Sequence, residues 1–484
     1  MNLEKNLFGL ISISFVGGIL GRGFEYLVYI GIARTLGPAA LGLFSFGLVV
    51  MSLSTTMSKV GLDKAARKFV PVYSDDKQML AGVLVICLGG SFIIGTLASV
   101  SIYFGSGFIT QYTSKAFTGA MLLFLIGIPL KTLMTVSRAA TTGFLTTKYS
   151  VYIKDFGQSG SAITLVFLAA VFIGTIESVI IAYVASMAIS AVLGVYFITR
   201  QGGFDGIWKP QLPVKKVFTY SLPLTLAAVA QYLITWTDIL MLSVFESANI
   251  VGVYQAAYQT ATILGFLMVA VGSIFPSVAS NLYDSGEKEQ LQTVFSALTK
   301  WVSYLSLLAF LFVIFYTDTI LGIFGNEFSS GSSILLLIGG AFVLSSAVGP
   351  SSFLLMMTGH ERVEMWNTSA ACVMNIVLNF VLIQSYGSLG AAVATGVSLV
   401  TLNLLRLVEV RILLEIFPQF KNYWKGTVAI MTSGVIMYAT TLVSVSKMVL
   451  FLPAGLVGLV VFILMMHQFG LDSEDKSLIE SVGA

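Results

Sequence analysis

The chain has 484 residues, of which 56% are hydrophobic and only 10% are charged. So few charges cannot cover the surface of a soluble globular protein of this length. The composition therefore excludes a soluble enzyme or binding domain and indicates a polytopic membrane protein. The net charge of +3 is too small and too dispersed to predict nucleic-acid binding.

Apolar runs of about 20 residues, the length that crosses a bilayer as a helix, recur along the whole chain. They predict an all-α polytopic membrane protein with about 14 transmembrane helices and with both ends on one side of the membrane. The predicted spans cover residues 7–33, 39–59, 79–104, 115–138, 150–173, 177–199, 217–243, 249–278, 296–316, 332–357, 363–384, 388–411, 425–446 and 449–468.

The distribution of Lys and Arg predicts the orientation of these spans. With the amino terminus in the cytoplasm, 20 of the 26 Lys and Arg residues fall at the cytoplasmic face. Only Arg34, Lys115 and Lys447 then lie outside. Because cytoplasmic loops of membrane proteins are enriched in positive charge, we expect a multi-pass protein of the cytoplasmic membrane with both termini in the cytoplasm.

Two halves of the chain resemble each other weakly. At an offset of 210 residues, Gly42-Leu43-Phe44 aligns with Gly252-Val253-Tyr254, without inversion of the membrane orientation. Duplicated bundles commonly place a substrate site between their halves. We predict two six-helix lobes with a pseudo-twofold relation plus two extra carboxy-terminal helices. The predicted domains are an amino-terminal lobe at 1–199, a cytoplasmic linker rich in Gly, Pro and charge at 200–216, a carboxy-terminal lobe at 217–414, and the two extra helices with a cytoplasmic tail at 415–484.

Arg22 lies near the middle of the first predicted span, with Glu25 three residues further on. Both belong to a helix face of polar and small residues that covers an arc of about 100°. This face consists of Ser14, Gly18, Gly21, Arg22, Glu25 and Tyr29. A guanidinium in hydrocarbon costs at least about 2.5–3.5 kcal/mol, so it normally faces a partner or a hydrated cavity. The face therefore indicates a transporter with a polar chamber, and the alternative is a structural Arg22–Glu25 ion pair.

Three segments resemble signatures of the polysaccharide flippases, which belong to the multidrug, oligosaccharidyl-lipid and polysaccharide exporter superfamily. They are residues 375–383 with 386–395, residues 251–258, and residues 36–42. The resemblance covers nearly the whole chain, including the span count. It implies a V-shaped pair of six-helix lobes that moves polyprenyl-linked oligosaccharides across the cytoplasmic membrane by alternating access, without making or breaking a bond.

Cations inside the predicted spans suit such a substrate, because a phosphate or pyrophosphate joins the polyprenyl chain to the glycan. Lys131, Lys154 and Arg406 lie within about two turns of the cytoplasmic ends of their spans, where they would form a loading vestibule. Arg22 would carry the anion at mid-depth, and Glu25 would keep it from binding too tightly. The alternative for the three inner cations is that they snorkel to the interface.

Acidic neighbours are expected to neutralise two of these cations. Asp155 follows Lys154 directly, and Glu409 lies three residues after Arg406. In this interpretation both acids are structural partners of the cations.

Aromatic residues in the seventh span suit the sugar part of the substrate. Tyr232 and Trp236 match the Arg22 region of the first lobe and would form an aromatic wall for sugar rings, the alternative being ordinary helix packing. Glu25 and Asp238 are the candidates for a coupling proton or sodium ion, although Asp238 also suits an interfacial position. Membrane potential is a third candidate driving force.

No catalytic constellation is present in the sequence. A Walker glycine loop, His-x-x-x-His spacing and the Gly-x-Ser-x-Gly motif are all missing, and the two cysteines lie far apart in apolar stretches. We therefore expect no enzyme activity, no cofactor and no metal.

Three other functions remain to be weighed. A multidrug/cation antiporter of the same superfamily would need an acidic chamber, whereas embedded basic residues outnumber acidic ones here. A peptidoglycan lipid-precursor flippase shares the helical plan. A membrane glycosyltransferase or polymerase would need a large catalytic loop, and the sequence has none. The expected partners are a lipid-linked oligosaccharide and membrane lipids, with a glycan polymerase or glycosyltransferases as candidate protein partners.

Overall fold

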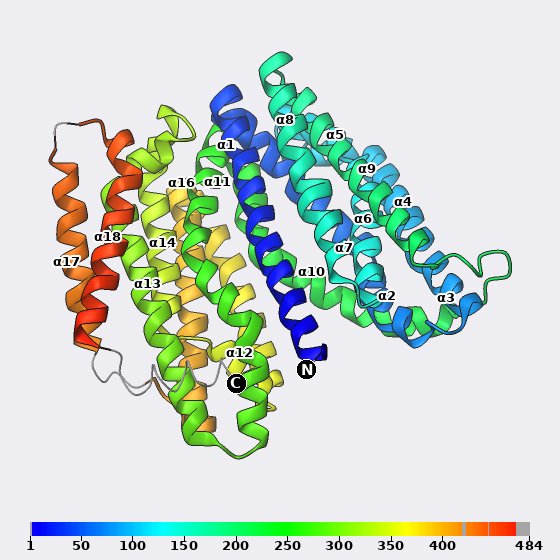
Figure 1. The fold of residues 1–484 in the computed structure, drawn as a ribbon. Coiled ribbons are helices and arrows are strands. Elements are labelled where there is room, and N and C mark those ends of the chain that lie inside the picture. Colours follow the sequence, from blue (N-terminus) through cyan, green and yellow to red (C-terminus); the bar gives the residue numbers. More distant parts are fainter. Residues whose placement is uncertain (1, 419–422, 444, 471–484) are drawn as a thin grey trace. The chain divides into compact units, whose positions relative to one another are not determined.

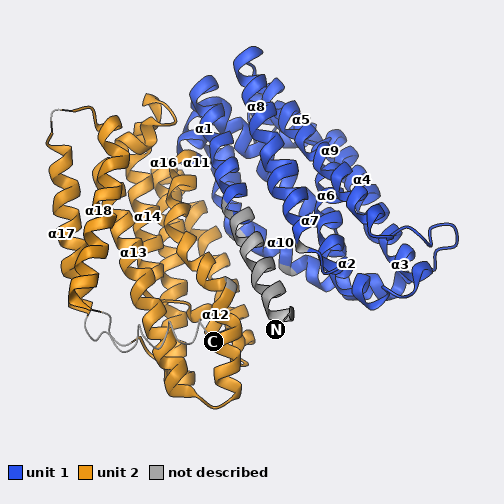
Figure 2. Ribbon diagram, in the orientation of Figure 1, with its two compact units in different colours: residues 1–255 blue, residues 256–484 orange. Residues whose placement is uncertain are grey.

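The computed structural model describes residues 2–418, 423–443 and 445–470, and every regular element among them is helical. The predicted all-α fold class is therefore confirmed. Contacts divide the chain into two compact units, unit 1 at Met1–Gln255 and unit 2 at Ala256–Ala484 (Figure 2). The boundary between the units falls inside the helix Ala248–Ala261, which belongs to the predicted carboxy-terminal lobe. The two lobes were inferred from an internal repeat, and they stay a prediction.

Unit 1 is organised around α1, Asn2–Ser58, which contains a break at Gly37 with φ of 80°. The other elements of unit 1 are α2 (Leu62–Val72), α3 (Lys77–Leu84), η1 (Val85–Gly89), α4 (Gly90–Ile109), α5 (Lys115–Phe124), α6 (Gly127–Gly143), α7 (Thr147–Val151), η2 (Tyr152–Gly160), α8 (Ser161–Phe172), α9 (Ile176–Arg200), α10 (Val214–Phe245) and the first half of α11 (Ala248–Ala261). Figure 1 shows α6 and α9 side by side in unit 1.

Unit 2 contains a second long helix with a break, α16, Glu361–Leu414, in which Gly387 has φ of 56°. A glycine is favoured at both breaks because a side chain would be strained at positive φ. The other elements of unit 2 are the second half of α11, η3 (Thr262–Gly265), α12 (Phe266–Asp284), α13 (Lys288–Gly322), η4 (Asn326–Gly331), α14 (Ser332–Ala347), α15 (Ser351–Met357), α17 (Tyr423–Thr441) and α18 (Lys447–Phe469).

Within the described residues, nine helices are long and apolar enough to cross a membrane, or up to 11 if each of two bent pairs is one span. This confirms a multi-pass membrane protein. The two bent pairs are Ala116–Phe124 with Gly127–Gly143 and Val214–Leu233 with Thr235–Phe245. α1 and α16 are each counted once despite their breaks, and the expected number of 14 crossings stays a prediction.

The glycines that aligned in the repeat, Gly42 and Gly252, meet in unit 1. A Cβ built on Gly42 would lie 1.9 Å from the Ala248 carbonyl oxygen, and one built on Gly252 would lie 1.8 Å from the Pro38 carbonyl oxygen. Residues 38 and 248 are themselves related by the same offset of 210, so the contact is reciprocal. Reciprocal contacts between equivalent residues are what a twofold axis produces. Small residues also allow membrane helices to approach this closely.

The predicted linker is packed tightly against α3. Lys77 forms an ion pair with Asp205 at 3.0 Å, and the backbone N–H of Gln211 donates to the Gln78 carbonyl at 3.1 Å. A Cβ on Gly82 would lie 1.7 Å from the Gln211 carbonyl oxygen. Residues 200–213 therefore hold the start of α10 close to α3.

The glycine contact gives a test of the packing. Gly42→Ala should lower the thermal unfolding midpoint of the detergent-solubilised protein, because overpacking a tight contact costs about 1–3 kcal/mol. Gly31→Ala on the same helix is the matched control, since a Cβ there has no neighbour within 4 Å. Equal midpoints for the two variants would contradict the packing described.

Candidate functional site

Lys154 and Asp155 are presented by η2, a π-helical segment packed against α1. A π-helix is rare and often occurs at functional sites. Its wider register leaves the Ile153 carbonyl to accept a hydrogen bond from the Ser190 hydroxyl of α9. The polar face of α1 that was predicted from the sequence packs against η2. A Cβ on Gly21 of this face would lie 2.4 Å from Asp155 Oδ1. Gly21 thus lets the buried Asp155 carboxylate approach the backbone of α1.

Glu25 forms an ion pair with Lys154, with 3.7 Å between Oε1 and Nζ and about a third of each side chain exposed (34% and 33%). Asp155 also interacts electrostatically with Lys154, and the expectation that it neutralises this cation stays a prediction. Within the π-helix, Lys154 extends to the carboxylate on α1, while Asp155 packs against Gly21. Arg22, one turn from Glu25, has an exposed side chain.

Lys131 and Tyr232 both bind to the same turn of α1. The Lys131 ammonium donates to the Ser52 hydroxyl, and the Tyr232 hydroxyl donates to the Val49 carbonyl at 3.1 Å. The Trp236 ring stacks on Tyr232, with 6.2 Å between ring centroids and 29° between planes. The structure therefore brings the predicted cationic and aromatic residues of α6 and α10 to the same part of α1.

Further charges extend this group. Arg138 Nε donates to the Ser150 hydroxyl at 2.9 Å, and Lys131 interacts electrostatically with Glu25, Lys59 and Lys154. Lys59 forms a separate ion pair with Asp63 at 3.4 Å. We call the remaining set the α1 cluster. It consists of Arg22, Glu25, Lys131, Arg138, Lys154 and Asp155, with four cations against two carboxylates.

Asp238 is 3% exposed and accepts hydrogen bonds from the Tyr254 hydroxyl at 2.6 Å and from the Ile239 N–H at 2.8 Å. Two donors already stabilise this carboxylate within unit 1. Its role as a coupling-ion ligand stays a prediction, as does that of Glu25.

Arg406 lies in unit 2 and forms a two-pronged ion pair with Glu364. Its Nε donates to Glu364 Oε2 at 2.8 Å and its Nη2 donates to Oε1, with the side chains 13% and 10% exposed. The expected partner Glu409 instead accepts a hydrogen bond from Asn367. The expectation fails because the two halves of α16 pack together, which brings Glu364 from 42 residues away closer than the neighbour on the same turn.

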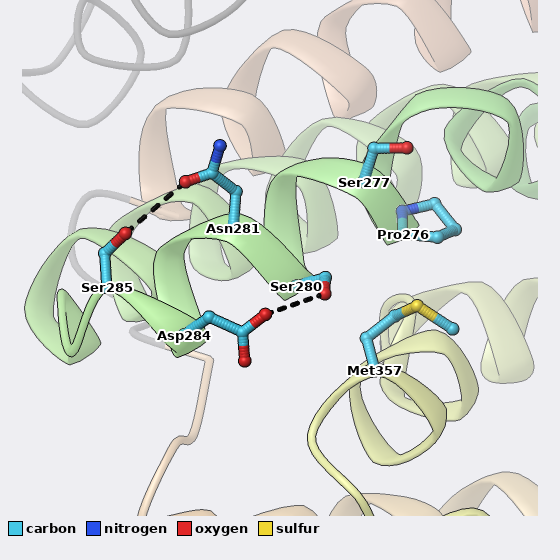
Figure 3. A pocket seen from close by; sticks show the side chains of 7 residues that line it. All are labelled: Pro276, Ser277, Ser280, Asn281, Asp284, Ser285 and Met357. Carbon is cyan, nitrogen blue, oxygen red and sulfur yellow. Dashed lines mark hydrogen bonds between the residues drawn. The ribbon is translucent and has the colours of Figure 1, made fainter.

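Unit 2 also has an open polar hollow of about 660 Å³ at the end of α12 (Figure 3). Its polar groups bond to one another: the Ser280 hydroxyl donates to Asp284 at 3.3 Å, and the Ser285 hydroxyl donates to Asn281 at 3.5 Å. It has one carboxylate and no cation among its described lining residues, so it does not suit a phosphate.

Sequence reasoning missed Ser52, Gln158, Tyr183 and Glu364. Gln158, four residues after Lys154 in η2, donates to the Tyr183 hydroxyl at 3.1 Å. A hydroxyl or amide inside an apolar span was the available signal for the first three. Glu364 lies at the end of a predicted span, where the sequence predicts that an acidic residue is exposed to solvent. No group of three His, Cys, Asp or Glu residues suited to hold a metal occurs in the described part of the chain.

Comparisons with known proteins show the family and the fold. The family model described as "Polysaccharide biosynthesis protein" matches residues 9–282, and the model "MatE" matches residues 223–381. The chain belongs to the polysaccharide biosynthesis protein family. It is 25% identical, over 97% of its length and 98% of the relative's, to the "Probable low-salt glycan biosynthesis flippase Agl15" of Haloferax volcanii.

Solved structures share the fold. One is "Lipid II flippase MurJ, inward closed conformation", with a TM-score of 0.74, 17% identity and coverage of 94% of this chain and 98% of that one. Another is an inward-facing multidrug resistance MATE family transporter of the MOP superfamily, with a TM-score of 0.70, 16% identity and coverage of 81% and 94%. The family and the shared fold confirm the prediction of a membrane transporter rather than an enzyme.

The contact between α1 and η2 can be tested with a double variant. Gly21→Ala should lower the thermal midpoint because its Cβ overlaps Asp155, and Asp155→Ala should recover part of that loss, with a coupling of about 0.5–3 kcal/mol. Gly23→Ala is the control, since a Cβ there meets nothing within 4 Å. Additive losses in the double variant would show that the two residues do not touch.

The Arg406–Glu364 pair can be tested by replacement. Arg406→Ala should destabilise the protein by about 3–5 kcal/mol because it leaves a buried carboxylate without its partner. Arg406→Met combined with Glu364→Leu should regain near-normal stability, because buried ion pairs can be replaced by apolar groups of similar volume. A double variant as unstable as Arg406→Ala would refute a purely structural pair.

Proposed function

We propose that the protein is a flippase that translocates an oligosaccharide linked to a polyprenyl phosphate or pyrophosphate across the cytoplasmic membrane. The observation that carries the proposal is the surplus of cations in the α1 cluster, partly exposed and within membrane-spanning helices. Charged side chains at this depth normally mark a substrate or ion pathway. An anion between the cations would balance the surplus.

Glu25 would act as an internal substitute for the substrate anion. Without ligand, its carboxylate holds Lys154 at 3.7 Å, a separation that a phosphate oxygen can reduce by displacing it. Arg22 would provide two parallel donors to the phosphate, and Lys131 would provide a point charge. Because the Glu25 carboxylate and the substrate phosphate replace each other beside Lys154, the site can bind and release the substrate without leaving Lys154 unpaired in the membrane.

The sugars would lie against Tyr232 and Trp236, whose stacked rings adjoin the turn of α1 that also holds Lys131. Aromatic faces offer apolar contact while leaving the polar ends of the rings accessible. Both termini would lie in the cytoplasm, Lys154 and Lys131 would load the substrate from that side, and the two lobes would alternate in access. A glycan polymerase or glycosyltransferases would act before or after this step.

The MatE match over residues 223–381 makes a multidrug/cation antiporter the second candidate. Organic cations would be repelled by the four cations of the α1 cluster, so the anionic substrate is favoured. A peptidoglycan lipid precursor has the same anion as the proposed substrate. A competition experiment between the two lipids would distinguish an oligosaccharide flippase from a peptidoglycan-precursor flippase.

The proposal is tested by transport of a labelled lipid-linked oligosaccharide in proteoliposomes, read by its accessibility to a membrane-impermeant glycosidase. Arg22→Ala should reduce transport about 100-fold or more, and Arg22→Lys about tenfold, because lysine keeps the charge but loses the planar fork. Arg34→Ala, on the same helix, is the control and should transport normally. Normal transport by Arg22→Ala would remove Arg22 from the substrate path.

A further inference from the structure

Unit 2 contains a cavity of about 460 Å³ between α12, α14, α15 and α16. This is within the usual range of about 300–1,000 Å³ for ligand pockets. Phe342 and Phe353 form walls that are seated against glycines: a Cβ on Gly265 would lie 3.0 Å from the Phe342 ring, and one on Gly272 would lie 2.6 Å from the Phe353 ring. The remaining lining combines apolar side chains such as Val269 and Leu399 and three glycines with a polar end of serines, Asn403 and Arg406.

The hydroxyl groups along the lining already donate hydrogen bonds to other groups of the protein. Ser345 donates to the Ala341 carbonyl at 2.8 Å, and Ser352 donates to Glu364 at 3.0 Å. A sugar entering this cavity would lose hydrogen bonds to water and gain few from these groups, which is unfavourable for a polar ligand.

The only cation among the described lining residues, Arg406, is neutralised by its two-pronged pair with Glu364. It also donates to Asn403 at 3.2 Å. A phosphate would have to displace Glu364 and leave that buried carboxylate without its partner, which is costly. The polar end of the cavity is therefore a neutral floor, in contrast to the α1 cluster.

We propose that this cavity binds a hydrocarbon chain, namely a stretch of the isoprenoid tail of the lipid-linked substrate. The inference rests on the proposed function for the source of the chain. Contact with apolar walls and a neutral floor favours an uncharged apolar group. A single-chain lipid fits one pocket of this size, whereas a two-chain phospholipid would have to separate its chains to enter it.

The test uses a polyprenol, the uncharged alcohol of the carrier, with a photoactivatable group near its tail end. Cross-linking to the purified full-length protein in detergent is followed by peptide mapping. The cross-links should fall on α12, α14, α15 and α16 around the cavity, and unlabelled polyprenyl phosphate should compete. A two-chain phospholipid with the same photoactivatable group serves as the second arm.

Ser345→Phe fills the cavity and should weaken polyprenol labelling about tenfold or more, since several apolar groups lose their burial. Ser369→Phe is the matched control and should label normally, because Ser369 is exposed on α16 and likewise donates to a carbonyl four residues before it. The thermal unfolding midpoints of the two variants are compared to check that both are folded.

The outcomes separate the two proposals. Unchanged labelling in folded Ser345→Phe would overturn the cavity as a chain site, even if Arg22→Ala abolishes transport. Loss of labelling in Ser345→Phe, with no glycan transport by the wild type, would support the chain site and refute the proposed function. Stronger labelling by the phospholipid than by the polyprenol would overturn the isoprenoid assignment.

Discussion

Charge within a membrane-spanning bundle is tolerated only where it is paired or hydrated, and this constraint explains how the protein uses its embedded ions. In unit 2, Arg406 and Glu364 form a buried pair that cancels its own charge. In unit 1, the Glu25–Lys154 pair is longer, partly exposed and accompanied by further cations. The first arrangement is complete without a ligand. In the second, the proposed role of a phosphate-bearing substrate is to add the negative charge that offsets the additional cations.

Close helix packing makes the arrangement in unit 1 possible. The side-chain-free surface of Gly21 lets Asp155 approach α1, and the Gly42–Gly252 contact joins two segments that the internal repeat relates. Membrane helices gain little from the hydrophobic effect against one another, so tight van der Waals contact at small residues provides much of their attraction. The positions of the α1 cluster therefore depend on glycines that carry no chemistry themselves.

Much of the fold could be predicted from the sequence, because apolar length alone identifies membrane helices. The polar face of α1 was also predictable from the spacing of Arg22 and Glu25. The partners of the embedded ions were not, since Glu364 reaches Arg406 through tertiary packing and Lys154 depends on a π-helix that no simple periodicity reveals. The linker at 200–216 was recognisable by its composition, but its tight packing on α3 was not.

The central claim is that the α1 cluster binds an anion, and binding of the substrate head group tests it most directly. The affinity of the purified protein should be measured for a polyprenyl-pyrophosphate-linked oligosaccharide and for a neutral analogue in which an ether replaces the pyrophosphate. The account predicts about 100-fold tighter binding of the charged lipid, and still tighter binding by Glu25→Gln, which removes the competing carboxylate. Equal affinity for the two lipids, or weaker binding by Glu25→Gln, would contradict it.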